Sequence, residues 1–524
     1  MRLSLYSIVS FHYFLRVQSI YLFQILILVL QKRIYNFILL SGILLVLFLP
    51  LLQSVFKFKK HIKPLKGAFI ETKEIELNAS TWLDGYYQKT EEDYLNENFG
   101  FRNYYVRLNN QVDYSLFNKA NVEKVVVGKG GFLYEDNYIT SYYGDNFAGK
   151  EILETKFKKL KDLQDLLYTQ NITLLPVFAP GKATFYPEFI PDNWCKEKKL
   201  NNYEYSVELF NKYGINYVDF NAWFLSLKNI TPYDLYPKTG IHWSNYGALI
   251  SFDTLTRHLE KLSKLNLKNL GISNISFSNE LIAPDDDIGI AMNLFKNVQP
   301  LPMPYAKYEW TDDSTFTKPN ALFIGDSYFW NLYYEGLINN VFHEAKFWYY
   351  NETVYPESEP QREVNKLNLL EEIKKQKLIV VMATDCNIHD FGWEFIEKAH
   401  EALKPEMQNI IRRKAYIQNI AEEIYKNPQW INDVKKKAKE KNITVEEMVK
   451  LDAAYVYETD YNRPEVVELT EENKKRILNT PAWIQQIKQK AKEKNISFEE
   501  MLELDAKYIF ATEQRKDLEK NKLP

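Results

Sequence analysis

The stretch Asn320-Ala-Leu-Phe-Ile-Gly-Asp-Ser327 decides the fold. Its apolar part, 320–325, predicts a buried strand, and the residues 331–341 after it predict a helix. In open α/β sheets, ligands sit beyond the carboxyl ends of the strands. Ser327 therefore stands where a nucleophile is expected. Gly325 lets the chain turn sharply, Asp326 shapes the turn, and backbone N–H groups at the helix start can stabilise an oxyanion.

Short apolar runs and amphipathic stretches alternate on both sides of this turn. This alternation predicts an α/β fold with a parallel sheet covered by helices on both faces. The segment 264–319 holds several prolines and little periodicity, so we interpret it as an insertion or long loops near the site. Further strands are predicted at 172–178, 215–220, 345–350 and 378–382, and further helices at 156–169, 202–213, 246–262 and 361–375.

The N-terminal end is strongly apolar. Residues 34–56 carry no charge, and about 20 apolar residues suffice to cross a membrane. We therefore expect an uncleaved transmembrane anchor within an N-terminal segment, 1–66. The apolar run from Ser19 to Leu30 is short for a span, so it is either a second weak span or the product of a start site placed too early.

The C-terminal end is different in composition. Strand patterns stop, Lys and Glu dominate, and a sequence repeat starts at Pro428 and again at Pro481. Each copy predicts a helix, an Asn turn and a second helix capped by Thr444 or Ser497. We therefore predict a central catalytic domain over 67–404 and a helical repeat region over 405–524, with assembly or partner docking as an alternative to a simple solvated surface.

Composition excludes several classes of function. The formal net charge of -3 gives no support to nucleic-acid binding. With only two cysteines in 524 residues, a disulfide framework is excluded and a thiolate metal site is not expected. No metal and no cofactor are predicted.

Two further segments carry candidate chemistry. The sequence Thr239-Gly-Ile-His-Trp-Ser244 places His242 in a loop before a helix, where it can serve as a general base. Thr384 and Asn387 follow an apolar strand, and either can donate to an oxyanion or shape the turn. Their alternative role is to cap a helix. His389 is the rival base, and His343 is also close to these segments in sequence.

The order of these motifs resembles the SGNH-like alginate O-acetyltransferase (AlgJ/AlgX) family. The matching stretches are Phe99-Gly-Phe-Arg102, Val125-Val-Val-Gly128 with Gly130-Gly-Phe-Leu-Tyr134, Pro176-Val-Phe-Ala-Pro-Gly-Lys182, His242-Trp-Ser244 and Gly325-Asp-Ser327. The resemblance covers about residues 80–400. It implies an SGNH-hydrolase-like fold, with Ser327 as nucleophile and His242 as base.

The resemblance also implies a location and partners. It predicts an enzyme on the periplasmic side of the cytoplasmic membrane that moves acetyl groups onto a polysaccharide. A multi-span membrane acyltransferase would supply those acetyl groups. Aromatic residues are candidates for a stacking wall that binds the sugar, with core packing as the alternative: Trp243, Tyr328, Phe329 and Trp330.

One position departs from the family pattern. The family often has Asp two residues before the histidine, and this chain has Gly240. Three explanations stay open: Asp234 orients the imidazole instead, the site is a Ser-His dyad or uses a carbonyl, or activity is lost. The rival functions are a polysaccharide acetylesterase with the same chemistry, a non-catalytic glycan-binding or assembly protein, and a D-alanyl transferase acting on a teichoic acid.

Overall fold

The computed structural model describes residues 2–56, 63–67, 76–311, 315–334, 336–459 and 464–514. By its internal contacts the chain divides into two compact units. The first comprises 1–135, 238–241 and 286–301, and the second comprises 136–237, 242–285 and 302–524.

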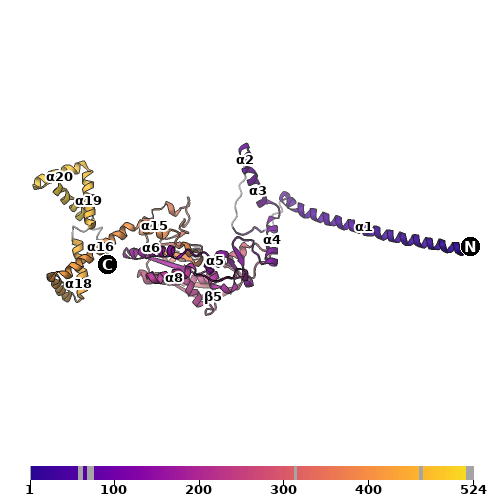
Figure 1. Ribbon diagram of the computed structural model, residues 1–524, viewed down its shortest axis with the longest axis horizontal. Helices are drawn as coiled ribbons and strands as arrows, with labels where there is room; N and C mark the ends of the chain where they lie inside the picture. Colours follow the sequence, from indigo (N-terminus) through magenta and orange to yellow (C-terminus); the bar gives the residue numbers. More distant parts are fainter. Residues whose placement is uncertain are drawn as a thin grey trace. The chain divides into compact units, whose positions relative to one another are not determined.

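The first unit begins with one long helix, α1 (Arg2–Phe56), which extends well before the predicted span at 34–56 (Figure 1). Within its part Tyr21–Phe56 a stretch of 18 residues has a mean hydropathy of 2.4, so this part is long and apolar enough to cross a membrane. The apolar run from Ser19 to Leu30 lies in this same helix. Among the described residues, no other helix meets these criteria.

Further short elements follow α1 in this unit. The strands β1 (Val125–Val127) and β2 (Leu133–Glu135) pair antiparallel. The N–H of Leu133 donates to the carbonyl of Lys238 at 2.9 Å, which ties β2 to a distant part of the unit. The helices are α2 (Ala79–Leu83), α3 (Tyr86–Asn98), α4 (Arg102–Phe117) and α11 (Asp287–Ala291).

A six-stranded sheet forms the centre of the second unit, in the order β4-β3-β10-β7-β8-β9. All neighbours are parallel except β8 and β9, so one edge of the predicted parallel sheet is antiparallel. The central strands β3, β7 and β10 are almost fully buried, as their uninterrupted apolar runs predict. The strands are β3 (Thr173–Ala179), β4 (Val218–Asp219), β7 (Ala321–Gly325), β8 (Ala345–Tyr349), β9 (Thr353–Tyr355) and β10 (Leu378–Thr384).

Helices cover both faces of this sheet. Leu322 and Ile324 of β7 lie in one buried cluster with the apolar sides of α6 (Lys150–Thr169), α8 (Asn202–Tyr213) and α15 (Phe395–Ala402). Phe323, which points to the opposite face, stacks on Phe329 of α12 (Phe329–Tyr334) with ring centroids 4.6 Å apart. The α9 (Phe220–Leu227) and α10 (Asn245–Ser263) helices also contact β3. The centre of this unit is therefore an α/β layer structure with helices on both faces of the sheet, as predicted.

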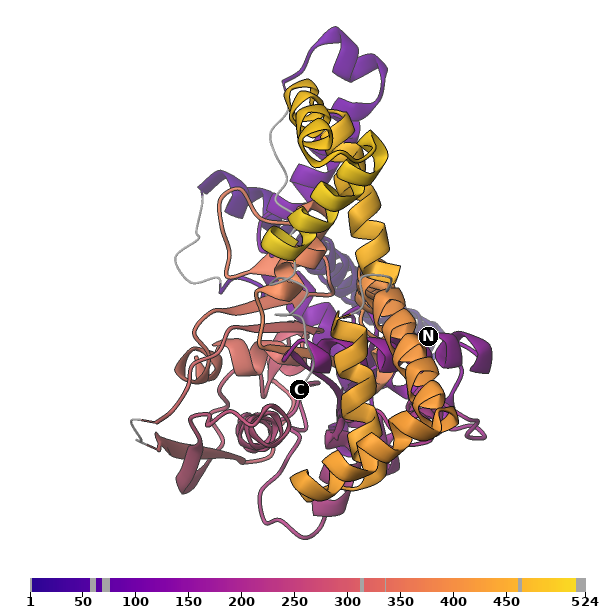
Figure 2. The same cartoon turned by 90° about the vertical axis from the view of Figure 1, so that its left-hand side faces the viewer.

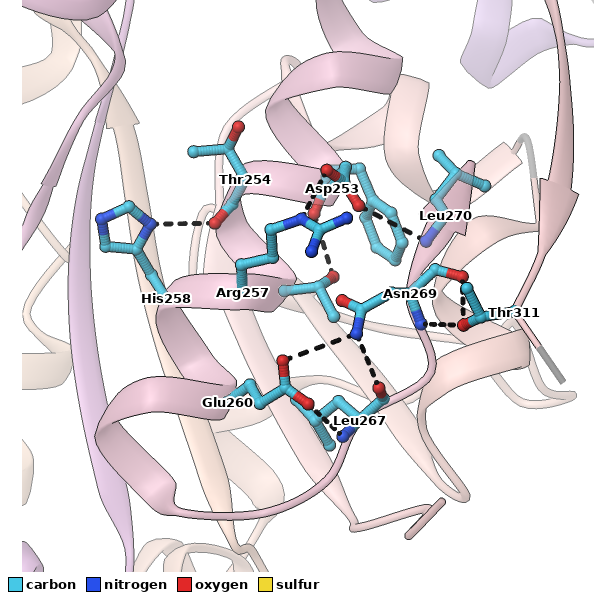
Figure 3. A network of polar contacts seen from close by, with 11 residues as sticks. Asp253, Thr254, Arg257, His258, Glu260, Leu267, Asn269, Leu270 and Thr311 are labelled. Atoms are coloured by element: carbon cyan, nitrogen blue, oxygen red, sulfur yellow. Dashed lines mark hydrogen bonds and ion pairs between the residues drawn. The ribbon is translucent and has the colours of Figure 1, made fainter. Parts of the chain in front are cut away.

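The interpretation of 264–319 as loops is wrong in part. Within it, β5 (Leu270–Ser278) and β6 (Met303–Trp310) form an antiparallel ribbon. Figure 3 shows the side chains that hold the segment before β5: Glu260 of α10 accepts the N–H of Leu267 at 3.1 Å, and Thr311 Oγ1, just after β6, accepts the N–H of Asn269 at 3.1 Å. The segment 361–375 also differs, because its only regular elements are a short 3-10 turn and α14 (Leu369–Lys374).

The described C-terminal residues form helices joined by short turns, coloured orange to yellow in Figure 2. Each repeat has its own apolar core. Thr444 and Ser497 cap the second helix of each copy, with Glu447 and Glu500 bonding back, so the predicted capping boxes are confirmed. The helices are α16 (Lys404–Lys426), α17 (Pro428–Lys441), α18 (Val445–Thr459), α19 (Pro464–Leu478), α20 (Pro481–Lys494) and α21 (Phe498–Ile509).

Both cysteines are free thiols: Cys195 is exposed and Cys386 is buried. No disulfide therefore joins the two cysteines of the chain.

Candidate active site

Ser327 lies in the tight turn between β7 and α12. Gly325 is the last residue of β7. It pairs with Met382 of β10 on one side and with Tyr349 of β8 on the other. A Cβ atom on Gly325 would lie 3.2 Å from the carbonyl oxygen of Met382, so a side chain here would crowd the adjacent strand. Ser327 itself is partly exposed, whereas Asp326 and Tyr328 on either side of it are buried. The turn therefore presents the serine hydroxyl at the carboxyl edge of the sheet.

The structure brings His242 to this hydroxyl. The Nε2 atom of His242 and the Oγ atom of Ser327 are 3.0 Å apart, although 85 residues separate them in the chain. The imidazole also packs on the ring of Tyr328, with centroids 4.9 Å apart. This distance is within the range in which an imidazole can take the proton of a serine.

The N-terminus of α10 holds the loop of His242. Ser244 is the N-cap: its Oγ accepts the N–H of Gly247 at 2.9 Å and donates to the carbonyl of Asp234 at 2.8 Å. Asp285, which the sequence did not single out, is fully buried and accepts the N–H of Asn245 at 3.1 Å. Its only signal in the sequence was its place in a run of three aspartates, and such runs usually lie on solvated surfaces.

Asp326 fastens the turn of Ser327 to β10. Its Oδ2 accepts three hydrogen bonds, from Thr384 N–H at 2.8 Å, Thr384 Oγ1 at 2.7 Å and Asn387 Nδ2 at 2.9 Å. Its Oδ1 accepts the N–H of Tyr328 at 3.1 Å. Asn387 Nδ2 also donates to Thr384 Oγ1 at 3.2 Å. Of the two roles predicted for Thr384 and Asn387, the geometry supports holding the turn, because these donors are already engaged.

The structure does not bring Asp234 to His242. The Asp234 carboxylate makes no hydrogen bond among the described residues, and its charge contributes to raising the pKa of Tyr186, after the larger effect of burial. Partial burial raises the pKa of Asp234 itself. Asp234 therefore does not orient the imidazole in this arrangement, and the prediction for it is corrected.

The stacking role predicted for Trp243 and Tyr328 is wrong. Both side chains are 0% exposed, so neither face can meet a sugar. Trp243 packs among Phe220, Phe224 and Tyr328, and the Tyr328 hydroxyl lies 3.3 Å from that of Tyr236. Burial raises the pKa of Tyr328 well above its ordinary value, so the phenol stays neutral. The two residues support the site from within the core.

The rival histidines lie elsewhere. His389 Nδ1 is 3.0 Å from the carbonyl oxygen of Cys386, and His343 is exposed at the end of α13 (Leu337–Val341). Only His242, among the described residues, has a hydrogen bond to Ser327.

Asp385, the residue that follows Thr384 in the chain, is a second buried carboxylate near the site. Thr184 Oγ1 donates to its Oδ2 at 2.5 Å, and any side chain at Gly181 would collide with the carboxylate. Burial, opposed by the Thr184 hydrogen bond, raises the pKa of Asp385 to about 7. Its Oδ1 has no hydrogen-bond partner among the described residues. No pattern in the sequence indicates this environment, because Asp385 is a single polar residue directly after an apolar strand.

The described residues contain no cluster of His, Cys, Asp and Glu side chains able to hold a metal ion. The possible chemistry of the site follows from the contact between Ser327 and His242. A hydroxyl beside an imidazole is the arrangement that performs acyl transfer through a covalent intermediate.

Comparison with known proteins finds a similarity that includes both residues of this site. Residues 125–331 match the family model of the SGNH hydrolase-like domain of acetyltransferase AlgX. The probable alginate O-acetylase AlgJ of Pseudomonas fluorescens is 24% identical over 200 residues, which cover 36% of this chain and 46% of that protein. The chain thus spans about half the length of this curated relative.

Solved structures with a similar chain path include three from bacteria. The O-acetyltransferase domain of Pseudomonas putida AlgJ is 14% identical, with 53% of this chain and 99% of that chain covered and a TM-score of 0.34. Bacillus cereus PatB1 is 12% identical, covering 52% and 99%, with a TM-score of 0.34. Pseudomonas aeruginosa AlgX is 14% identical, covering 54% and 71%, with a TM-score of 0.34.

Proposed function

We propose that this chain, whose residues 125–331 form an SGNH hydrolase-like domain of the AlgX type, is an O-acetyltransferase that acetylates a polysaccharide through an acyl-serine intermediate. The observation that carries the proposal is the 3.0 Å contact between His242 Nε2 and Ser327 Oγ. The similarity to a probable alginate O-acetylase supports a polysaccharide as the acceptor.

The first half-reaction acylates the serine. His242 Nε2 takes the proton of Ser327 Oγ while the oxygen attacks the carbonyl carbon of a donor acetyl ester. The tetrahedral intermediate collapses, the bond to the donor oxygen breaks, and His242 returns the proton to that oxygen. The products are acetyl-Ser327 and the free donor alcohol.

The second half-reaction moves the acetyl group onward. A sugar hydroxyl gives its proton to His242 Nε2 and attacks the acetyl carbon. The bond between that carbon and Ser327 Oγ breaks, and the serine oxygen takes the proton back. Transfer wins over hydrolysis when the site holds a sugar hydroxyl in place of water.

We place the reaction outside the cytoplasm, with α1 as the anchor in the cytoplasmic membrane. The apolar segment Tyr21–Phe56 supports this. A multi-span membrane acyltransferase would deliver the acetyl groups to the outer face. Protease treatment of spheroplasts tests the location: the domain should be digested without lysis, and full protection until lysis would contradict the placement.

Mass spectrometry tests the covalent step. The purified protein is incubated with p-nitrophenyl acetate and quenched in acid, and the peptide that carries Ser327 is examined. We expect one acetyl group on Ser327 of the wild type and none on that peptide in Ser327→Ala. The protein with an added glycan should then release acetyl to the glycan, whereas an esterase would release free acetate alone. An unmodified Ser327 in folded wild-type protein would overturn the proposal.

A further inference from the structure

Four aromatic rings form a continuous row at the carboxyl edge of the sheet. The ring centroids of Trp330 and Tyr349 are 5.4 Å apart, those of Tyr349 and Tyr350 are 4.5 Å apart, and those of Tyr350 and Trp393 are 5.2 Å apart. All four side chains are partly exposed, in contrast to the fully buried Trp243 and Tyr328. We call these four residues the aromatic row.

The aromatic row starts at the turn that carries Ser327. Tyr349 pairs with Gly325 across β8 and β7, and the N–H of Tyr350 donates to the Gly325 carbonyl at 2.9 Å. The N–H of Trp330 donates to the Ser327 carbonyl at 3.2 Å. The backbones of three of the four residues are thus joined to Ser327 or to Gly325. The row therefore begins at the same edge of the sheet as the turn of Ser327.

The backbone of the row has left-handed positions in two loops, one of which is the tight turn between β8 and β9. Tyr350 and Trp393 have φ values of 50° and 45°, and the residues after them, Asn351 and Glu394, have φ values of 54° and 65°. Side chains larger than glycine disfavour this left-handed region, and bulky ones do so most. Strain of this kind concentrates at functional sites, where the surrounding structure enforces it.

The two strained segments are tied to each other. Asn351 Nδ2 donates to the carbonyl of Trp393 at 2.8 Å, which joins the loop after β8 to the loop that follows β10. Gly392, with a φ of 81°, stands directly before Trp393. Of these two consecutive left-handed positions, the first is a glycine, Gly392, and the second is a tryptophan, Trp393.

We propose that the aromatic row is the binding site for a pyranose ring of the acceptor polysaccharide, an inference that rests on the proposed function. Aromatic faces bury the apolar C–H face of a sugar, and tyrosine hydroxyls add hydrogen bonds at the edge of the ring. A few polar groups on a mostly aromatic surface are typical of small-molecule sites. The row thus gives the acceptor a position beside Ser327, the role for which the buried Trp243 and Tyr328 are unsuited.

Three variants of the full-length protein separate binding from folding. Trp393→Gly removes the ring, and glycine adopts the φ of 45° without strain. Trp393→Phe keeps a ring in the same place. Trp223→Ala is the matched control, because Trp223 is a partly exposed tryptophan of α9 that lies outside the row. Melting temperatures verify that each variant is folded.

Isothermal titration with alginate and cello-oligosaccharides measures binding directly. We expect the wild type and Trp223→Ala to bind at least one of these glycans equally well. Trp393→Gly should weaken that binding about tenfold, and Trp393→Phe should stay within about threefold of the wild type. Failure of the wild type to bind any of these pyranose chains at millimolar concentration would overturn the proposal, as would wild-type affinity in Trp393→Gly.

The acyl-serine assay keeps this proposal separate from the proposed function. If wild-type Ser327 becomes acetylated but Trp393→Gly keeps the wild-type KM for the glycan, the aromatic row is excluded while acyl transfer stands. If Ser327 is never acetylated but the titration gives the expected pattern, the row binds glycan and the proposed chemistry fails.

Discussion

Asp326 joins the turn of the serine to β10 through both hydrogen-bonding groups of Thr384, whose N–H and hydroxyl lie 2.8 and 2.7 Å from Asp326 Oδ2. The carboxylate is fully buried, so these bonds and those from Asn387 and Tyr328 replace its hydration. The position of Ser327 therefore depends on the contact between its neighbour Asp326 and Thr384, in which the Ser327 hydroxyl takes no part.

Replacing this carboxylate should disturb stability and activity together. In Asp326→Asn, an NH₂ group replaces one of the two carboxylate oxygens. It would face hydrogen-bond donors and could not accept their hydrogen bonds. We expect a loss of about 2–3 kcal/mol in the free energy of unfolding, because hydrogen bonds to a charged group are broken. Urea unfolding and acetyl transfer rates measure the two effects. Thr384→Ser is the control, since it keeps both donors. Wild-type stability and turnover in Asp326→Asn would show that the contact is dispensable.

Removing either partner of the 3.0 Å contact should abolish acetyl transfer. We expect Ser327→Ala and His242→Ala each to lower kcat by about 10³-fold or more, and the double variant to be little worse, because the two groups act as a unit. Initial rates with p-nitrophenyl acetate provide the measurement. An additive loss in the double variant would mean that the residues do not work together.

Asp385 predicts how stability depends on pH. Burial raises its pKa to about 7 in the folded protein, above about 4 in an unfolded chain. Between these values the folded state binds more protons than the unfolded state, so this residue's contribution makes stability fall as pH rises from about 4 to 7. The neutral variant Asp385→Asn should have a flatter dependence of Tm on pH in that window. A slope equal to the wild-type slope would contradict the assignment.

The helix cap beside His242 can be compared with an equivalent cap far along the chain. Ser244 caps α10 and Ser497 caps α21, each through its hydroxyl and a backbone N–H. Changing either serine to alanine should cost about 1 kcal/mol of local stability. Only Ser244→Ala should also lower the acetyl transfer rate, because its cap fixes the loop of His242. Equal rates in the two variants would separate the cap from catalysis.

We also propose that the helical repeats are separable from the catalytic domain. Within α16, Met407 and Ile410 pack on the core of the sheet, whereas Ile420 and Ile424 belong to the core of the first repeat. A chain ending at Arg413 keeps the first contacts and should retain wild-type acyl-serine formation and Tm. A chain ending at Leu403 loses them and should melt at a lower temperature. A shorter chain that melts like the wild type would place the boundary earlier.

The sequence by itself determined the local structure of this protein. The apolar runs around 320–325 and 378–382 are strands, the amphipathic stretch 202–213 is a helix, and Ser497 and Glu500 form the predicted capping box. These features depend on residues close together in the chain, so periodicity and capping chemistry suffice to predict them. The motif order also indicated the fold and the candidates Ser327 and His242.

Tertiary structure alone decided which of those residues meet. Strand β10 lies between β3 and β7 in the sheet although it comes last of the three in the chain, and this order carries Thr384 and Asn387 to Asp326. It also buries Trp243 and Tyr328 and leaves the aromatic row partly exposed. Burial and contact across 58 or 85 residues depend on how the layers pack, and no local pattern in the sequence records that packing.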